Sequence, residues 1–167
     1  YDKSRKKLFE INNNGPGGPE VLPVLYIKEN LYIAVTSNSD SGGSYTLILT
    51  GINSFNPMEI EPNNRKEDSN PVKNIIKGYT TCTGDIDYYI VTNESKKNYR
   101  IEFRAPANGS VKLSTTDQSG YIIKSQDASN GQTVTINEIF EKRGYIIIET
   151  VSLDLENLYD LIIEEVR

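Results

Sequence analysis

Residues 58–64 read Met-Glu-Ile-Glu-Pro-Asn-Asn, and residues 84–89 read Gly-Asp-Ile-Asp-Tyr-Tyr. Both stretches place oxygen-bearing side chains close together in the sequence. An extended chain directs alternate side chains to the same side, so each stretch presents an acidic edge. The oxygen-bearing residues are Glu59, Glu61, Asn63 and Asn64 in the first stretch and Asp85 and Asp87 in the second.

Two acidic edges of this kind either repel each other across a gap or share a cation. Calcium prefers roughly six to eight oxygen ligands from carboxylates, amides, main chain and water. One interpretation is therefore a Ca²⁺ site that joins a linker to the first strands of a β domain. The other is a solvated linker followed by an acidic loop, because Pro62 and the two asparagines are ordinary turn formers.

The sequence after residue 70 predicts a series of short strands, as in a β-sandwich. The clearest alternation is Tyr-Arg-Ile-Glu-Phe-Arg at 99–104, with the apolar residues on the inner side. Asn108-Gly109 predicts a tight turn of the hairpin type, and Asn130-Gly131 predicts another turn. The only helical feature we expect is a short turn around 137–142. The candidate strands are 72–79, 87–92, 99–104, 111–114, 121–124, 132–136, 145–151 and 158–166.

These motifs resemble the bacterial pre-peptidase C-terminal (PPC) domain family. The pattern is Glu-Pro-Asn at 61–63 followed by Gly-Asp-Ile-Asp-Tyr-Tyr at 84–89, and it is similar to the collagen-binding domains of clostridial collagenases. Ser-Gly-Gly-Ser-Tyr-Thr-Leu-Ile at 41–48 looks like the last strand of such domains. The resemblance covers 59–167 and, as half a domain, about 8–52. It implies a secreted jelly-roll β-sandwich without catalytic activity.

The resemblance also implies calcium ligands. In the calcium-binding relatives, acidic and Asn residues of the entering linker and Asp residues before the Tyr-Tyr strand hold the ion. Two positions depart from that pattern: Asn64 stands where relatives have Asp, and Gly84 aligns with a liganding Asp unless Asp85 replaces it. We therefore expect a weaker site than the family's most acidic ones. The ligands that match are Glu59, Glu61, Asn63, Asn64 and Asp87, with Asp85 in reserve.

An internal repeat suggests that the chain holds part of a second module. With an offset of 114 residues, 22–52 align with 136–166 without a gap. We predict the C-terminal half of a first module at 1–52, with strands at 21–27, 31–37 and 45–50. A linker with the candidate calcium site follows at 53–70, and a complete module occupies 59–167. The alternative is a chance pairing of β-rich segments. The identical pairs are Lys28/Lys142, Ile33/Ile147, Thr36/Thr150, Asp40/Asp154, Tyr45/Tyr159, Leu47/Leu161 and Ile48/Ile162.

Composition excludes several kinds of function. The 167 residues include no His, which excludes Ser-His and Cys-His catalysis and the usual zinc sites. The single Cys82 provides no disulfide framework, and the neighbouring carboxylates disfavour a reactive thiolate. A net charge of −5 argues against nucleic acid, and no apolar run is long enough to span a membrane. The chain begins at Tyr1 rather than Met, so we expect a processed or trimmed product, and removal of an export signal is one way to produce it.

We therefore expect a non-catalytic accessory or binding module of a secreted or cell-surface bacterial protein. Its expected partners are an extracellular protein or polysaccharide and the rest of the parent protein. The first half-module is expected to pair with another segment or chain. Two alternatives remain open: an accessory domain of a peptidase whose catalytic domain lies elsewhere, and a structural spacer repeat on the cell envelope.

Overall fold

The computed structural model describes residues 1, 3–7, 10–12, 14–15, 17–20, 30–37, 43–50, 59–72, 74–80, 83–152 and 157–166. Within this part, all regular structure lies after residue 65. It consists of one 3₁₀ turn, η1 (Lys66–Asp68), and nine strands. The strands are β1 (Asn70–Pro71), β2 (Ile75–Thr80), β3 (Ile86–Thr92), β4 (Lys97–Arg104), β5 (Ser110–Asp117), β6 (Ile122–Ser129), β7 (Thr133–Phe140), β8 (Arg143–Ser152) and β9 (Asn157–Val166).

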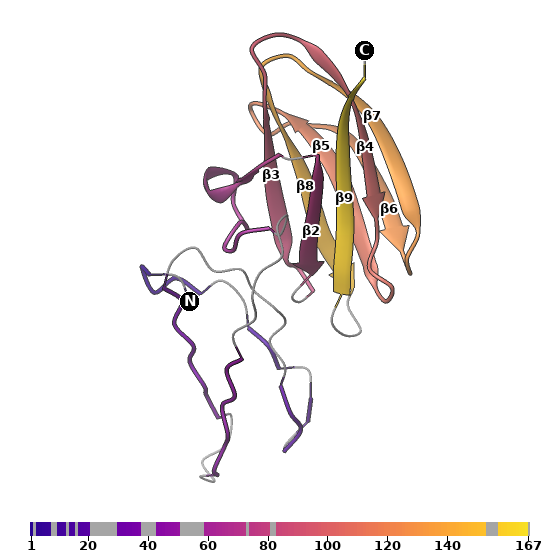
Figure 1. Cartoon of the computed structure of the whole chain (residues 1–167). Helices are drawn as coiled ribbons and strands as arrows, with labels where there is room; N and C mark the ends of the chain where they lie inside the picture. Colours follow the sequence, from indigo (N-terminus) through magenta and orange to yellow (C-terminus); the bar gives the residue numbers. More distant parts are fainter. Residues whose placement is uncertain are drawn as a thin grey trace.

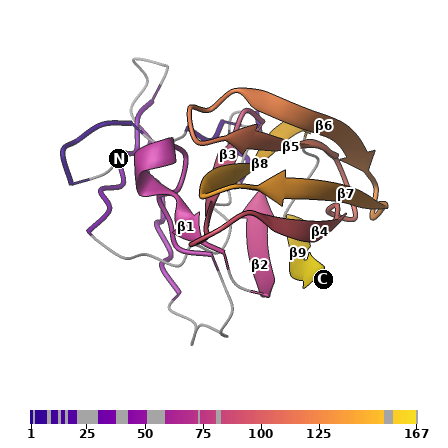
Figure 2. The same cartoon turned by 90° about the horizontal axis from the view of Figure 1, so that it is seen from above.

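The strands form two sheets packed face to face (Figures 1 and 2). One sheet has the order β2-β9-β4-β7 and the other β1-β3-β8-β5-β6. All pairings are antiparallel except that of β1 with β3. Every connection changes sheet except β5 to β6, which is the strand order of a jelly roll. The predicted jelly-roll β-sandwich is therefore confirmed.

The core lies between the two sheets, where alternate residues of most strands face inward. β7 shows the pattern most clearly, with every second residue from Val134 to Phe140 buried. Aromatic rings fill the centre, and the rings of Phe103 and Tyr159 lie 5.5 Å apart between centroids. The buried apolar set includes Ile76, Tyr89, Val91, Ile101, Phe103, Val111, Leu113, Val134, Ile136, Phe140, Ile146, Ile148, Tyr159, Leu161 and Ile163.

The eight strands expected after residue 70 correspond in order to β2–β9. The alternation at 99–104 is confirmed, since Ile101 and Phe103 are fully buried and Arg104 is exposed. The short strand β1 was not predicted, because Asn70-Pro71 carries no apolar pattern.

Two sequence predictions about connections are wrong. Asn108-Gly109 does not close a hairpin, because β4 and β5 lie in different sheets and the chain crosses between them. The crossing is fixed by Gly109, whose φ is 105°, and by the carbonyl of Gly109 accepting a hydrogen bond from the Asn130 amide at 3.1 Å. The helical turn expected around 137–142 is absent, since β7 continues to Phe140 with its inner side chains in the core. The predicted turn at Asn130-Gly131 is confirmed, with positive φ at both residues.

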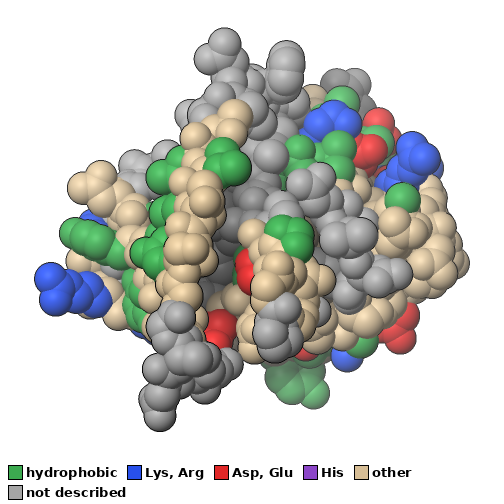
Figure 3. Space-filling model, turned by 90° about the horizontal axis from the view of Figure 1, so that it is seen from below, with side chains coloured by type: hydrophobic (Ala, Val, Ile, Leu, Met, Phe, Trp, Pro, Cys, Tyr) green, Lys and Arg blue, Asp and Glu red, His purple; other side chains and the backbone are tan. Residues whose placement is uncertain are grey.

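The described residues at 31–37 and 45–50 are not strands, which corrects the prediction for these two segments. Within the described part of the chain, no strand pairs with their main-chain groups, although Tyr1 and Tyr32 exchange two hydrogen bonds of 2.9 and 3.0 Å. A strand forms only where neighbours pair its backbone and cover its apolar side. The apolar side chains instead stay exposed, Ile48 by 79% and Tyr45 by 70%. Several hydrophobic side chains are visible on the surface of the molecule seen from below (Figure 3). The predicted strand at 21–27 lies outside the described residues.

Candidate metal centre

The candidate site forms where the segment 59–64 enters the sandwich. This segment runs between β2 of one sheet and β3 of the other. The Glu59 amide donates to the Lys77 carbonyl of β2 at 3.0 Å, and the Tyr88 amide of β3 donates to the Asn63 carbonyl at 3.0 Å. The Asn70 side chain fixes the segment further, because its amide bonds both main-chain groups of Ile60 at 3.0 and 3.2 Å. The segment is therefore bound to both sheets.

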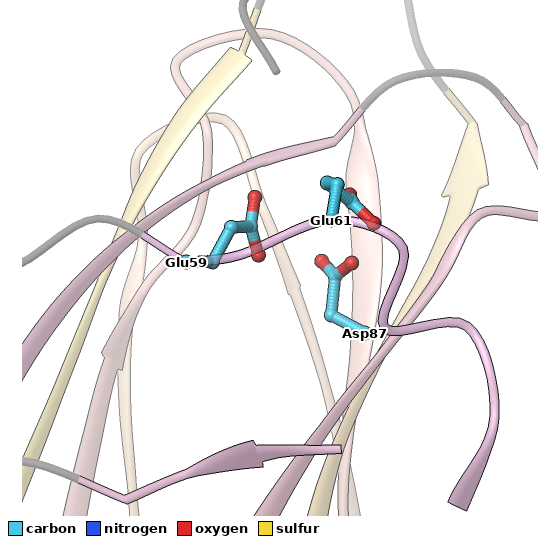
Figure 4. A group of neighbouring side chains, drawn as sticks. All are labelled: Glu59, Glu61 and Asp87. Atoms are coloured by element: carbon cyan, nitrogen blue, oxygen red, sulfur yellow. The ribbon is translucent and has the colours of Figure 1, made fainter. Parts of the chain in front are cut away.

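The alternation predicted from the sequence brings the acidic side chains together. Glu59, Glu61 and Asn63 are buried, while the residues between them are partly exposed. Glu59, Glu61 and Asp87 each direct a carboxylate oxygen to a common point, and these oxygens lie within 4.8 Å of one another. Figure 4 shows the three carboxylates converging, two from the entering segment and one from β3. We call these three residues the carboxylate cluster.

Two tyrosine hydroxyls in the core contact this cluster. The hydroxyl of Tyr89 lies 2.7 Å from Oε2 of Glu59 and 2.6 Å from the hydroxyl of Tyr159. The Tyr159 hydroxyl also lies 2.7 Å from Oε2 of Glu59 and 2.7 Å from Oδ2 of Asp87. Four short oxygen–oxygen contacts thus share two hydroxyl protons, since each hydroxyl donates only one hydrogen bond. The cluster therefore requires additional positive charge, from protons on the carboxyls or from a cation.

Burial produces the same requirement. Removal from water raises the pKa of Glu59 to about 7, from an ordinary value of 4.5. It also raises the pKa of Glu61 and of Asp87 well above the usual range, and the charges of neighbouring carboxylates add to the effect. None of these three residues forms an ion pair within the described chain. Near neutral pH the cluster accordingly retains protons or takes up a cation.

The side chain of Asn63 borders the cluster and is 0% exposed. One atom of its amide lies 2.9 Å from Oδ1 of Asp87 and 3.0 Å from Oε2 of Glu61. With Nδ2 at that point, the amide donates to both carboxylates and its oxygen accepts from Asn70 at 2.9 Å. With Oδ1 at that point, the amide adds a further oxygen to the ligand set. The Asn63 side chain thus suits both the protonated and the cation-bound forms of the site.

The remaining two predicted ligands pair with each other beside the cluster. Nδ2 of Asn64 donates to Oδ1 of Asp85 at 2.8 Å, and Oδ1 of Asn64 is buried without a hydrogen-bond partner. Asp85 is buried, and its charge contributes to the raised pKa values of Glu59, Glu61 and Asp87. All six predicted residues are thus neighbours, with four around one point and two adjacent to it.

Sequence reasoning missed the residues that support the cluster. Gly78 on β2 leaves room for the Tyr159 ring, because an added Cβ would lie 2.1 Å from Cζ and 2.2 Å from the hydroxyl oxygen. Thr150 positions Asp85 through a hydrogen bond from its amide to the Asp85 carbonyl at 2.8 Å. A signal was present, since the internal repeat matches Tyr45 with Tyr159 and Thr36 with Thr150. Cys82 lies outside the described residues.

No protein-family model matches this chain, and no curated protein matches it. Among solved structures, the chain is similar to the pre-peptidase C-terminal domain of collagenase from Bacillus anthracis. That likeness has 21% identity and a TM-score of 0.49, covering 61% of this chain and 100% of the other. This domain belongs to the family that the sequence motifs resemble.

A second similar structure is a CBM36 carbohydrate-binding module in complex with calcium and xylotriose. Its identity is 16% and its TM-score 0.35, with 53% of this chain and 78% of that chain covered. The jelly-roll assignment depends on the strand pairing of this chain itself.

The described residues also contain no helix with the length and hydrophobicity of a membrane span.

Proposed function

We propose that the chain is a non-catalytic accessory module of a secreted or cell-surface bacterial protein, stabilised by one calcium ion. The ion would bind Glu59, Glu61, Asn63 and Asp87, with Asn64 and Asp85 completing the site directly or through water. Its role would be to hold the entering segment against both sheets and so fix the module to the part of the protein before it. An extracellular protein or a polysaccharide is the proposed partner.

The proposal depends on one observation: the buried carboxylate cluster has fewer protons than its short oxygen–oxygen contacts require. Three carboxylates and two tyrosine hydroxyls meet without a positively charged side chain bonded to the carboxylates in the described chain. A divalent cation supplies the missing positive charge. Calcium fits better than zinc, because the available ligands are oxygens and the chain has no His. Magnesium fits less well, because it requires strict octahedral geometry and gives up its water reluctantly.

Burial also argues against a catalytic role for these carboxylates. Glu59 and Glu61 are each 3% exposed and Asp87 is 1% exposed, so a substrate has no access to them. A general acid or base must lie within hydrogen-bond reach of the group it protonates or deprotonates. The absence of His removes the commonest partner for a nucleophile. A structural role therefore suits the cluster better than an enzymatic one.

The internal repeat supports a proposal about how the chain is divided into modules. Under the 114-residue offset, 31–37 align with the centre of β8 and 45–50 with β9. Each of these two strands has a neighbour on both sides in the sandwich. The inward residues Tyr159 and Leu161 correspond to Tyr45 and Leu47, which are exposed here. We propose that 1–52 form the C-terminal half of a similar module, whose other strands come from a different segment or chain.

Isothermal titration calorimetry tests the calcium site directly. Protein stripped with EDTA should bind one calcium ion per chain, and Asp87→Asn should abolish binding or weaken it by more than about tenfold. The matched control is Asp127→Asn, since Asp127 is an exposed aspartate on β6. Absence of calcium binding to the native chain, or equal affinity in both variants, would contradict the proposal.

A further inference from the structure

A groove lies on the open side of the sandwich, where β6 ends one sheet and β7 ends the other. Its volume is about 410 Å³. As terminal strands, β6 and β7 each have one edge whose main-chain groups pair with no other strand of the described residues. The groove is lined by Lys124, Ser125 and Gln126 from β6 and by Thr135, Ile136 and Asn137 from β7.

The edge of β7 has the features of a strand that recruits another. It is eight residues long and contains no proline. Its four outward side chains, Thr133, Thr135, Asn137 and Ile139, are uncharged and mostly β-forming. Natural proteins usually interrupt such edges with charges, bulges or coverings, because unpaired strands pair with other chains.

Two main-chain groups on this edge are occupied by charged side chains. The ammonium of Lys124, from β6, donates to the carbonyl of Asn137. The amide of Ile139 donates to Oε1 of Glu138 at 2.8 Å. In an antiparallel strand the amide and carbonyl of one residue point to the same side, and alternate residues share that side. Asn137 and Ile139 therefore both present groups to the edge that β4 does not use.

Contacts from the other sheet hold the Glu138 side chain beside the edge of β7. Its side chain points inward and is 6% exposed, and Oε2 accepts from the Thr115 hydroxyl at 2.9 Å. Oε2 also lies 3.7 Å from the ammonium of Lys124, so the pair links the two sheets across the groove. A carboxylate at an inward position costs solvation free energy that an aliphatic side chain there would avoid. A role at the strand edge accounts for this position.

We propose that Lys124 and Glu138 form an edge cap, which keeps the β7 edge of this chain from pairing with the β7 edge of a second copy. Without the cap, the β7 strands of two copies would pair antiparallel about a two-fold axis. The outward side chains of β7 carry no charge, so this pairing sets no like charges opposite each other. The cap occupies a carbonyl and an amide near the end of β7 that such pairing would use.

Sedimentation velocity over a concentration series tests the cap. The variants are Lys124→Met, which keeps the aliphatic stem, Glu138→Gln, which keeps the shape, and the double variant. We expect the double variant to self-associate at least about tenfold more tightly than the native chain, a change of about 1.4 kcal/mol. Lys112→Met, which removes a lysine from β5, should sediment like the native chain.

A rescue variant identifies the surface. Thr135→Lys places a charge at the centre of the outward side of β7, so two copies would oppose like charges. Added to the double variant, it should restore the native sedimentation. Native-like sedimentation of the double variant, or association that Thr135→Lys leaves unchanged, would overturn the proposal. Circular dichroism melts show whether each variant folds. If the double variant does not fold, the sedimentation of Lys124→Met alone is the test of the cap, because the Lys124 side chain is half exposed.

Discussion

The hydroxyl oxygen of Tyr159 lies 2.7 Å from Oδ2 of Asp87, although 72 positions separate the two residues. Tyr159 belongs to β9 and Asp87 to β3, so this contact joins the two sheets. Glu59 of the entering segment meets the same hydroxyl at 2.7 Å. The last strand, an early strand and the entering segment thus converge on one oxygen atom.

Replacing Tyr159 with Phe should test this junction. The change removes the hydroxyl and leaves the buried carboxylates of Glu59 and Asp87 with one fewer donor. We expect a loss of about 1–3 kcal/mol in the free energy of unfolding, measured by urea denaturation without calcium. Tyr121→Phe is the control, because Tyr121 is exposed. Equal stability of the two variants would show that the hydroxyl contributes nothing.

Gly78→Ala should weaken the site from the opposite side. The added Cβ would meet the Tyr159 ring at 2.1 Å, so the ring must move away from the carboxylates. We expect a loss of about 1–3 kcal/mol in stability and weaker calcium binding in a calorimetric titration. At Gly43 an added Cβ meets no atom, so Gly43→Ala should leave calcium affinity unchanged. If Gly78→Ala behaves like Gly43→Ala, the close packing against Tyr159 is unimportant.

The calcium-free chain should lose stability as the pH rises. The pKa of Glu59 is about 7 in the folded chain against 4.5 ordinarily, and the pKa values of Glu61 and Asp87 are also raised. Protonation therefore favours the folded state. For Glu59 this contribution is complete below about pH 4.5 and is lost as the pH rises through 7. Melting temperatures in EDTA should fall between pH 5 and pH 8.

Glu61→Gln provides the comparison for this titration, because it removes one of the three carboxyls with raised pKa values. The dependence of its melting temperature on pH should be shallower than that of the native chain. Identical slopes for the native and variant chains would mean that the cluster does not govern the pH dependence.

The sequence was sufficient for local features and insufficient for those that depend on distant pairing. Alternating apolar residues predicted most of the strands β2–β9, because a strand that packs on the core buries one face. β6 is an exception, since its residues 122–127 are all exposed. The same alternation identified Glu59, Glu61 and Asn63 as one side of the entering segment. Asn108-Gly109 has the composition of a hairpin turn, yet the chain crosses to the other sheet there, because β4 pairs with β7 and β9.

The other features that the sequence did not predict correctly also depend on distant strand pairing. Tyr159 and Gly78 reach the cluster only through the pairing of β2 with β9, in which they occupy opposite positions. No local pattern marks such a pair. In contrast, 31–37 and 45–50 have a strand pattern but no strand partners within the described residues, so the pattern alone did not produce strands there.

The central claim is that a calcium ion occupies the carboxylate cluster, and a thermal melt tests it most directly. The native chain is melted in EDTA, in millimolar Ca²⁺ and in millimolar Mg²⁺, beside a variant with Glu61→Ala and Asp87→Ala. A ligand at one hundred times its dissociation constant stabilises the folded state by about 2.7 kcal/mol. We predict that calcium raises the native melting temperature by on the order of ten degrees, magnesium by much less, and that the variant does not respond. A native chain that melts at the same temperature in calcium and in magnesium would contradict the account.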